Sequence, residues 1–373
     1  MEFQADCKPV LLIPNEITGL VRLPVWPLIM LISRSGFPGH LKYGSIVGTV
    51  FRPHTMPVFF LILTCAFWGL SFPVVKALHL EQAARLPGAT SQFLSAWMQV
   101  ARFGVAALLL LPFVARDARP TRLELRQGLW IALWGGLGMG IQADGLAHTD
   151  ASISAFLTQA YCIFLPLWAC LKHRKAPGAR VILATVLVLT GGAILSGMRL
   201  EHLRLGRGEL ETILAAFLFT FQILLLEDPK YAETRGMPVT FVMFVGITAL
   251  FLPITAVLAR HPADCLLAGA SWQALVMILF LASFCSVVAY LLMNIWQPRV
   301  PATEAGLIYT TEPVFTAIYV VFLPGLLSTL INSSYQNETI TQSLLIGGSL
   351  IIAANVLMQW KRKAHPPAVA PVQ

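Results

Sequence analysis

The chain has 373 residues, of which 57% are hydrophobic and 12% are charged. A typical soluble domain carries roughly 25% charged residues, and a water-soluble globule of this length could not bury so much apolar surface. The formal net charge of +8 does not indicate a nucleic-acid-binding protein, because the basic residues lie in short connectors between long apolar runs. The composition therefore predicts an integral membrane protein surrounded by lipid.

The first 55 residues differ from the rest of the chain. Six prolines interrupt them, and their apolar run at 25–32 is too short to cross a bilayer. Proline and charge also interrupt any stretch that could serve as the core of a signal peptide. We expect residues 1–55 to be a poorly structured extension, with Met56 opening the first membrane span.

Ten apolar runs follow, and each is long enough to form a helix across about 30 Å of hydrocarbon. Alternate connectors carry nineteen and five of the 26 Lys and Arg residues, and the other two lie inside spans. The positive-inside rule places the richer connectors, and with them both termini, in the cytoplasm. The predicted spans are 57–80, 95–115, 127–147, 151–171, 179–197, 208–227, 238–259, 273–296, 303–324 and 342–360.

The two halves of the chain resemble each other. Residues 151–164 align with 302–315 at a constant offset of 151, which places Tyr161 opposite Glu312, and the first and fifth spans align with the sixth and tenth. Five spans per half is an odd number, so the second copy enters the membrane from the opposite side. The prediction is an all-α integral membrane protein with ten transmembrane helices, arranged as two inverted five-helix repeats at 57–198 and 206–361, with a cytoplasmic tail at 362–373.

Several motifs carry a family resemblance: AFWGLSFPVVK at 66–76, GLAHTDASISAFLTQAYCIFLPL at 145–167, LTGGAIL at 189–195 and ATEAGLIYTTEPVF at 302–315, together with Arg102. With these motifs the chain resembles the EamA-like permeases of the drug/metabolite transporter superfamily. The resemblance implies two five-helix repeats around a central cavity that moves small organic molecules, often outward. The chain departs from the family pattern where the ninth span ends in Leu323–Gly325, and in the longer polar loop that follows.

Glu312 is the most informative residue, because an ionisable group inside the hydrocarbon costs several kcal/mol and needs a reason to be there. Pro313 follows it and removes a backbone donor, which favours a kink that exposes carbonyl groups to a cavity. Pro73 is expected to kink the first span in the same way. We expect Glu312 to carry a proton; the alternative is a structural tie to a neighbouring helix.

Three other ionisable residues of the predicted spans are candidates for the pathway. We expect Lys76 either to hold an anionic substrate group or to extend to the outer interface. Arg102 is expected either to pair with a carboxylate, Glu312 or Asp144, or to cap helix ends. Asp144, with Gln142, is expected either to contact substrate or to lie in a water-filled outer vestibule.

Polar and aromatic side chains complete the candidate pathway. The repeat places Gln159 and Tyr161 opposite Thr310 and Glu312, so both are candidates for the cavity wall. The aromatic side chains serve either substrate stacking or helix packing. The predicted substrate and proton pathway consists of Glu312, Tyr161, Gln159, Tyr309, Trp68, Arg102, Lys76, Gln142, Asp144, Tyr290 and Asn294.

No metalloprotease, serine-hydrolase or nucleotide-binding motif is found, and the six cysteines form no CxxC pair. We therefore predict no catalytic site, metal or cofactor, and a secondary active exporter of small organic metabolites or drugs that works by alternating access. The expected location is the bacterial inner membrane. Proton coupling and a homodimer are left open. The alternatives are a non-transporting receptor or scaffold, or a membrane-embedded enzyme.

Overall fold

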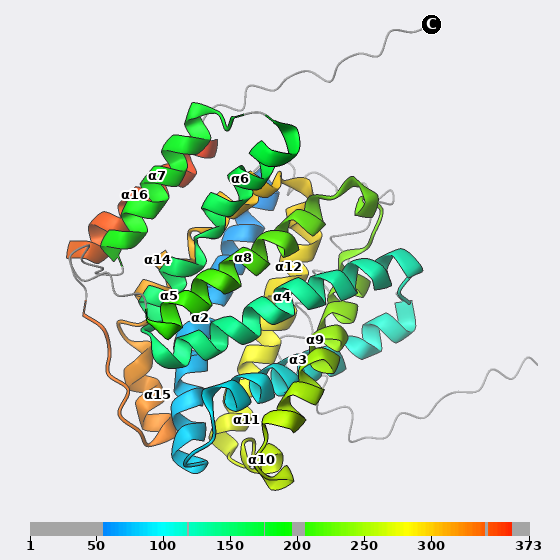
Figure 1. Ribbon diagram of the computed structural model, residues 1–373, viewed down its shortest axis with the longest axis vertical. Coiled ribbons are helices and arrows are strands. Elements are labelled where there is room, and N and C mark those ends of the chain that lie inside the picture. Colours follow the sequence, from blue (N-terminus) through cyan, green and yellow to red (C-terminus); the bar gives the residue numbers. More distant parts are fainter. Residues whose placement is uncertain (1–54, 118, 175, 196–205, 340–341, 360–373) are drawn as a thin grey trace, which may run out of the picture.

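The computed structural model is α-helical throughout the part that it describes, with no strand in that part (Figure 1). The described residues are 55–117, 119–174, 176–195, 206–339 and 342–359. They confirm the all-helical prediction. The predicted extension, except for Thr55, and the predicted tail at 362–373 lie outside them.

The described part of the first half contains six helices. The predicted fourth span is divided into two helices by a turn at Gln159 and Ala160. α4 begins at a capping box, in which Thr121 Oγ1 accepts a hydrogen bond from the Glu124 backbone at 3.3 Å and Glu124 Oε2 accepts one from the Thr121 backbone at 2.7 Å. The helices are α2 (Thr55–Arg85), α3 (Ser91–Asp117), α4 (Arg122–His148), α5 (Ala151–Thr158), α6 (Tyr161–His173) and α7 (Ala179–Leu195).

The second half contains more breaks than the first. Its predicted eighth span is one continuous helical run whose middle third, Leu281–Val288, is a π-helix, η4. The α-helices are α8 (Arg207–Glu227), α9 (Gly236–Leu258), α10 (Pro262–Leu267), α11 (Trp272–Phe280), α12 (Ala289–Trp296), α13 (Ala302–Tyr309), α14 (Glu312–Tyr319), α15 (Leu323–Ile331) and α16 (Gln342–Gln359). Two short 3₁₀ turns are η3 (Pro229–Tyr231) and η5 (Gln297–Arg299).

Six helical segments of the described chain are long and apolar enough to cross a membrane. The number rises to seven if the pair formed by Ala302–Tyr319 and Leu323–Ile331, which is bent by 62°, is one span. Shorter apolar helices lie at Ala179–Ile194 and Leu345–Ala354. The chain is therefore a multi-pass membrane protein, and the ten-helix arrangement in two repeats stays a prediction.

At the predicted end of the ninth span, Leu323–Gly325, the chain bends and opens α15. Pro324 is tolerated there because it lies in the first turn of the helix. The following loop folds back over the bend: Gly325 N donates to Asn337 Oδ1 at 2.6 Å, and Glu338 N donates to Val320 O at 2.8 Å. The expected span end is thus a change of helix direction.

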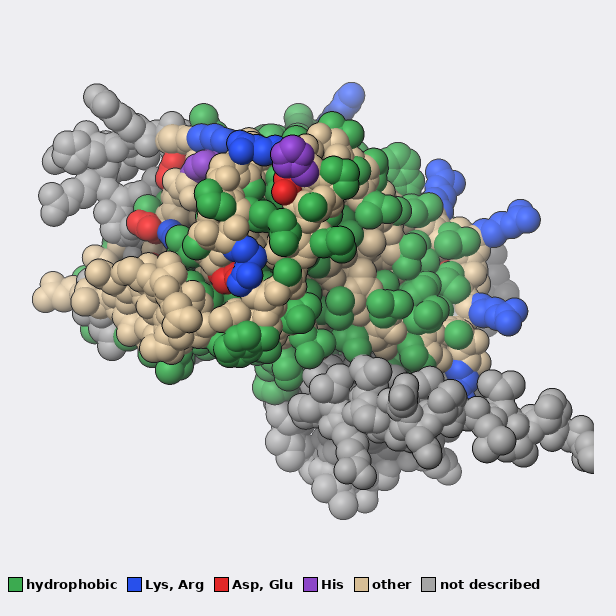
Figure 2. All heavy atoms as spheres, turned by 90° about the horizontal axis from the view of Figure 1, so that it is seen from below, with side chains coloured by type: hydrophobic (Ala, Val, Ile, Leu, Met, Phe, Trp, Pro, Cys, Tyr) green, Lys and Arg blue, Asp and Glu red, His purple; other side chains and the backbone are tan. Residues whose placement is uncertain are grey.

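The two halves are interleaved, as Figure 1 shows: α4 packs against α8 and α9, and α3 packs against α9. α7 and α16 form a pair at the edge of the molecule. Small residues allow these close approaches, since a side-chain carbon added to Gly128 would lie 2.6 Å from Val242 Cβ. Figure 2 shows hydrophobic side chains spread over one face, as expected of a surface that contacts lipid.

Candidate functional site

A central cavity lies between the two halves, with about 570 Å³ of empty space that includes space open to solvent. Both halves line it, and its wall mixes aromatic, amide, hydroxyl and charged side chains. The lining residues are Trp68, Ser71, Arg102, Met139, Gln142, Thr158, Tyr161, Phe219, Gln222, Ile223, Tyr290, Met293, Tyr309 and Glu312.

Glu312 reaches this cavity because the helix is interrupted directly before it. α13 ends at Tyr309, two threonines form a turn, and α14 begins at Glu312. Pro313 lies in the first turn of α14, where its missing N–H group is not needed. The structure therefore shows a helix break where the sequence predicted a kink. Pro73, by contrast, lies inside α2, which continues past it.

A second break faces the first one. α5 ends at Thr158 and α6 begins at Tyr161, so the interrupted positions of the two halves match at the repeat offset of 151. Tyr161 OH donates to Gln159 Oε1 at 2.6 Å, and Gln159 Nε2 donates to Ala155 O at 3.1 Å. The Gln159 side chain also hydrogen-bonds with Glu312. Gln159 is thus not among the residues that line the cavity, but connects Tyr161 with Glu312.

Three aromatic rings form one wall of the cavity. The Trp68 ring lies 5.3 Å from the ring of Tyr290 and 5.3 Å from that of Tyr309. The hydroxyl groups point to different partners: Tyr290 OH donates to Met139 Sδ at 2.9 Å, and Tyr309 OH donates to Gln297 Oε1 at 2.8 Å. The apolar faces of the rings remain available for packing against an organic molecule.

The structure corrects the expected pairing of Arg102. Its guanidinium contacts no carboxylate among the described residues: Nε donates to Ser286 Oγ at 2.7 Å and Nη2 to Cys285 O at 3.0 Å. Asp144 pairs with Arg207 instead, because α8 starts beside the end of α4. Asp144 is therefore buried, not open to a vestibule.

Lys76 and Asn294 do not line the cavity either. Lys76 Nζ donates to Thr149 O at 2.9 Å and lies 3.2 Å from Asp150 Oδ1. Asn294 Nδ2 donates to Thr240 Oγ1 at 2.8 Å, which ties α12 to α9. Of the eleven predicted pathway residues, the cavity brings together Glu312, Tyr161, Tyr309, Trp68, Arg102, Gln142 and Tyr290.

Sequence reasoning missed half of the cavity wall. Gln222 could have been found, because it is a polar residue within the apolar run at 208–227. Ser71 and Thr158 carry a weaker signal, since hydroxyl groups inside a membrane helix often bond to their own backbone. The other missed residues, Met139, Phe219, Ile223 and Met293, look like ordinary packing residues in the sequence.

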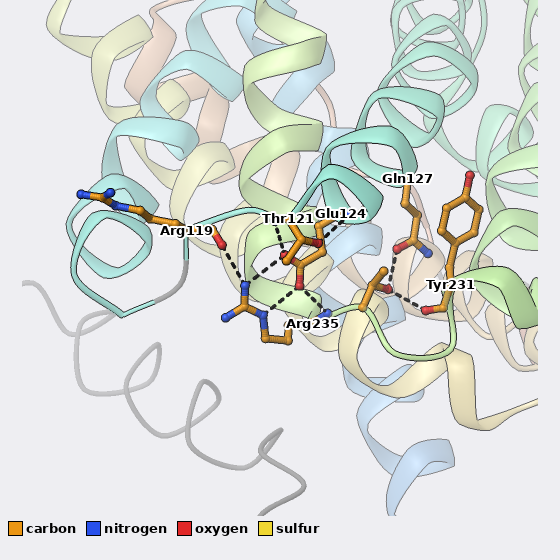
Figure 3. Close-up of polar contacts among 7 residues, drawn as sticks. Arg119, Thr121, Glu124, Gln127, Tyr231 and Arg235 are labelled. Carbon is orange, nitrogen blue, oxygen red and sulfur yellow. Dashed lines mark hydrogen bonds and ion pairs between the residues drawn. The ribbon is translucent and has the colours of Figure 1, made fainter.

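A second polar cluster lies at the opposite end of α4 from Asp144, and Figure 3 shows it. Arg235 Nε donates to Glu124 Oε1 at 2.8 Å, and Arg235 Nη2 donates to Arg119 O at 2.8 Å. Burial alone would raise the pKa of Glu124, but the hydrogen bonds from Arg235 and from the Thr121 backbone lower it to about 2. This ion pair joins the start of α4 in the first half to the start of α9 in the second.

The comparisons with known proteins agree with this architecture. Residues 55–197 match the model of the EamA-like transporter family. An Archaeoglobus fulgidus protein described as an uncharacterized transporter is 24% identical over 264 residues, which cover 70% of this chain and 76% of that protein. A solved crystal structure superimposes with a TM-score of 0.56 at 15% identity, covering 81% of this chain and 95% of that one, and so shares the fold. Residues 55–197 are therefore similar to the EamA-like transporter family, and the apolar helices make the chain a multi-pass membrane protein.

Proposed function

We propose that the protein is a secondary active transporter that exports small organic molecules through the central cavity, and that Glu312 is its proton carrier. The observation that carries the proposal is the position of Glu312: a buried carboxyl at the start of a half-helix, on the wall of a cavity that both halves line. Intramembrane carboxyl groups that face a cavity are typical of proton relays in transporters.

The two matched helix breaks support alternating access. Transporters with inverted repeats bind substrate and coupling ions where discontinuous helices of the two halves meet near the middle of the bilayer. Here the breaks before Tyr161 and before Glu312 occupy equivalent positions of the repeat, and both residues line the same cavity. This agrees with a ten-span arrangement in which the halves rock around a fixed site.

The chemistry of the residues that line the cavity favours a small organic molecule as the transported solute. Three neighbouring aromatic side chains offer apolar surface, while the amides of Gln142 and Gln222 offer hydrogen bonds. A cavity wall that combines aromatic surface with placed polar groups is typical of sites for small molecules. The family resemblance favours the outward direction.

The proposal is tested by measuring proton movement across the membrane of lipid vesicles into which the purified protein has been inserted. A panel of small organic acids, amines and amides is added to one side, and an internal pH dye reports proton flux that depends on the solute. We expect the wild type and Glu227→Gln to show such flux with at least one compound. Glu227 is an exposed carboxylate at the end of α8 and serves as the matched control.

Glu312→Gln should insert and fold normally, because the amide has nearly the shape of the protonated acid. Its solute-dependent proton flux should be lost, while solute movement down its own gradient persists. The proposed coupling would be contradicted if the Gln variant kept the proton flux of the wild type. It would also be contradicted if no compound of the panel caused proton flux in the wild type.

A further inference from the structure

A second, smaller cavity adjoins the central one. It is lined by α2, α3 and α4 alone. Four residues, Ser71, Arg102, Met139 and Gln142, line both cavities. The other residues of the small cavity lie nearer the α2–α3 connection; they are Phe72, Val75, Met98, Gln99, Ala143 and Leu146. Arg102 therefore stands at the junction between the two cavities.

The charge of Arg102 is not balanced by any carboxylate in the part of the chain that the structure describes. Each of four other cations has such a partner: Lys76 has Asp150, Arg85 has Glu81, Arg207 has Asp144, and Arg235 has Glu124. Those four cations are partly exposed, whereas Arg102 is only 6% exposed. Buried charges in proteins are normally paired, so an unbalanced one beside two cavities calls for a ligand.

The guanidinium of Arg102 is held in one orientation. Its two hydrogen bonds go to neutral oxygens, Ser286 Oγ and Cys285 O, and both residues belong to the π-helix η4. The guanidinium carbon also lies 5.2 Å from the centre of the Phe103 ring. Arginine has five N–H donors, and these two bonds use two of them. A fixed planar fork with spare donors suits a carboxylate or another compact oxyanion.

We propose that Arg102 binds an anionic group of the transported solute, a carboxylate or a similar oxyanion, at the junction of the two cavities. The apolar part of the solute then packs on the wall formed by Trp68, Tyr290 and Tyr309 in the central cavity. The inference rests on the proposed transport through this cavity. Ser286 acts as a positioning residue, because it touches the guanidinium and does not line either cavity.

A purely structural role for Arg102 makes different predictions. In that case the arginine only ties α3 to the π-helix, and its removal would lower stability without regard to any solute. A binding role instead predicts that the wild type distinguishes acids from uncharged compounds of the same shape, and that this distinction depends on Arg102. The two roles can be separated at equilibrium, without measuring transport.

The experiment measures how the apparent melting temperature of the purified protein rises with ligand concentration, since a bound ligand stabilises by mass action. The probes are matched acid and amide pairs, 3-phenylpropionate with 3-phenylpropanamide and indole-3-acetate with indole-3-acetamide, together with phenyl phosphate. We expect an acid to stabilise the wild type and its amide to fail. Phenyl phosphate shows whether the site prefers carboxylate or phosphate.

Three variants locate the effect. Arg102→Gln should weaken acid binding by at least about 30-fold, the order expected when one partner of a buried charge pair is removed. Ser286→Ala keeps the charge but loosens its orientation, and should weaken acid binding by about two- to tenfold. Arg85→Gln removes an arginine that is paired with Glu81 outside both cavities, and should bind acids as the wild type does.

The proposal is overturned if no acid stabilises the wild type, if amides or amines stabilise it as well as the acids do, or if Arg102→Gln retains the affinity for acids. Should Arg102→Gln fail to fold, Ser286→Ala decides: unchanged acid affinity overturns the proposal. Because binding is read without a pH gradient, a failure of proton coupling at Glu312 would leave this result standing, and the reverse also holds.

Discussion

Two buried glutamates, Glu124 and Glu312, illustrate opposite uses of a carboxyl group in one membrane protein. Glu124 is 2% exposed and Glu312 is 6% exposed, so burial does not separate them. Their partners do. Glu124 accepts hydrogen bonds from the side chain and the backbone of Arg235. Within the described residues, Glu312 forms no ion pair; its carboxyl group hydrogen-bonds with the amide of Gln159, and it faces a cavity.

The difference teaches that the partners of a buried charge, more than its burial, indicate its role. A carboxylate bound to arginine stays charged and joins two elements. A carboxyl group on a cavity wall with an uncharged neighbour can exchange its proton with little change in the surrounding packing. The first arrangement holds the halves of the molecule together, and the second suits a step that must reverse in every transport cycle.

The largest expected difference between the two glutamates is in the effect of replacing each with glutamine on the stability of the protein. Glu124→Gln should lower the free energy of unfolding by about 1–3 kcal/mol, since it leaves Arg235, which is 41% exposed, without its carboxylate. Glu312→Gln should leave stability nearly unchanged. Melting of the two detergent-solubilised variants beside the wild type measures both values, and equal losses would show that the two carboxyl groups do not differ in role.

The pH dependence of stability tests whether the ion pair between Glu124 and Arg235 stabilises the folded protein. Its pKa is lowered to about 2 in the folded protein, from an ordinary value of 4.5. The unfolded chain therefore binds the proton first as the pH falls, so the contribution of the pair is complete above about pH 4.5 and is lost as the pH drops towards 2. Between about pH 5 and pH 3, the wild type should lose more stability than Glu124→Gln does.

A smaller effect is expected from Tyr161, which aligns with Glu312 in the predicted repeat. Tyr161→Phe removes the hydroxyl group that donates to Gln159 and leaves the ring. We expect solute-dependent proton flux to fall about two- to fivefold, because one neutral hydrogen bond contributes roughly 0.5–1 kcal/mol. Flux in the same vesicles measures this. A complete loss would mean that the proton pathway includes Tyr161 as well as Glu312.

The last prediction concerns the side of the membrane on which each end of the molecule lies. Single cysteines at Arg119 and Ser334, both exposed, are introduced into a cysteine-free background and labelled with an impermeant reagent in intact cells. We expect label at Ser334 and none at Arg119, because the positive-inside rule places the ion pair of Glu124 and Arg235 in the cytoplasm. Label at Arg119 would place that pair on the outer face and reverse the predicted topology.

The sequence predicted the helical membrane architecture and seven cavity residues, because long apolar runs and charges inside them are strong local signals. It singled out Glu312 but not Glu124, since Glu124 lies in a basic connector where a carboxylate attracts no notice. It also failed to pair Asp144 with Arg207. That contact depends on how closely α4 approaches α8, and helix packing across the repeat is not encoded by any local pattern.

The π-helix at Leu281–Val288 sets the rotational register of everything that follows it in the same helical run. An α-helix turns by about 100° per residue, so deleting one residue from this segment would restore regular winding and swing Tyr290 and Met293 away from the cavity wall. The Arg102 anchor at Cys285 and Ser286 would be displaced as well. A change of length within these eight residues should therefore abolish the site.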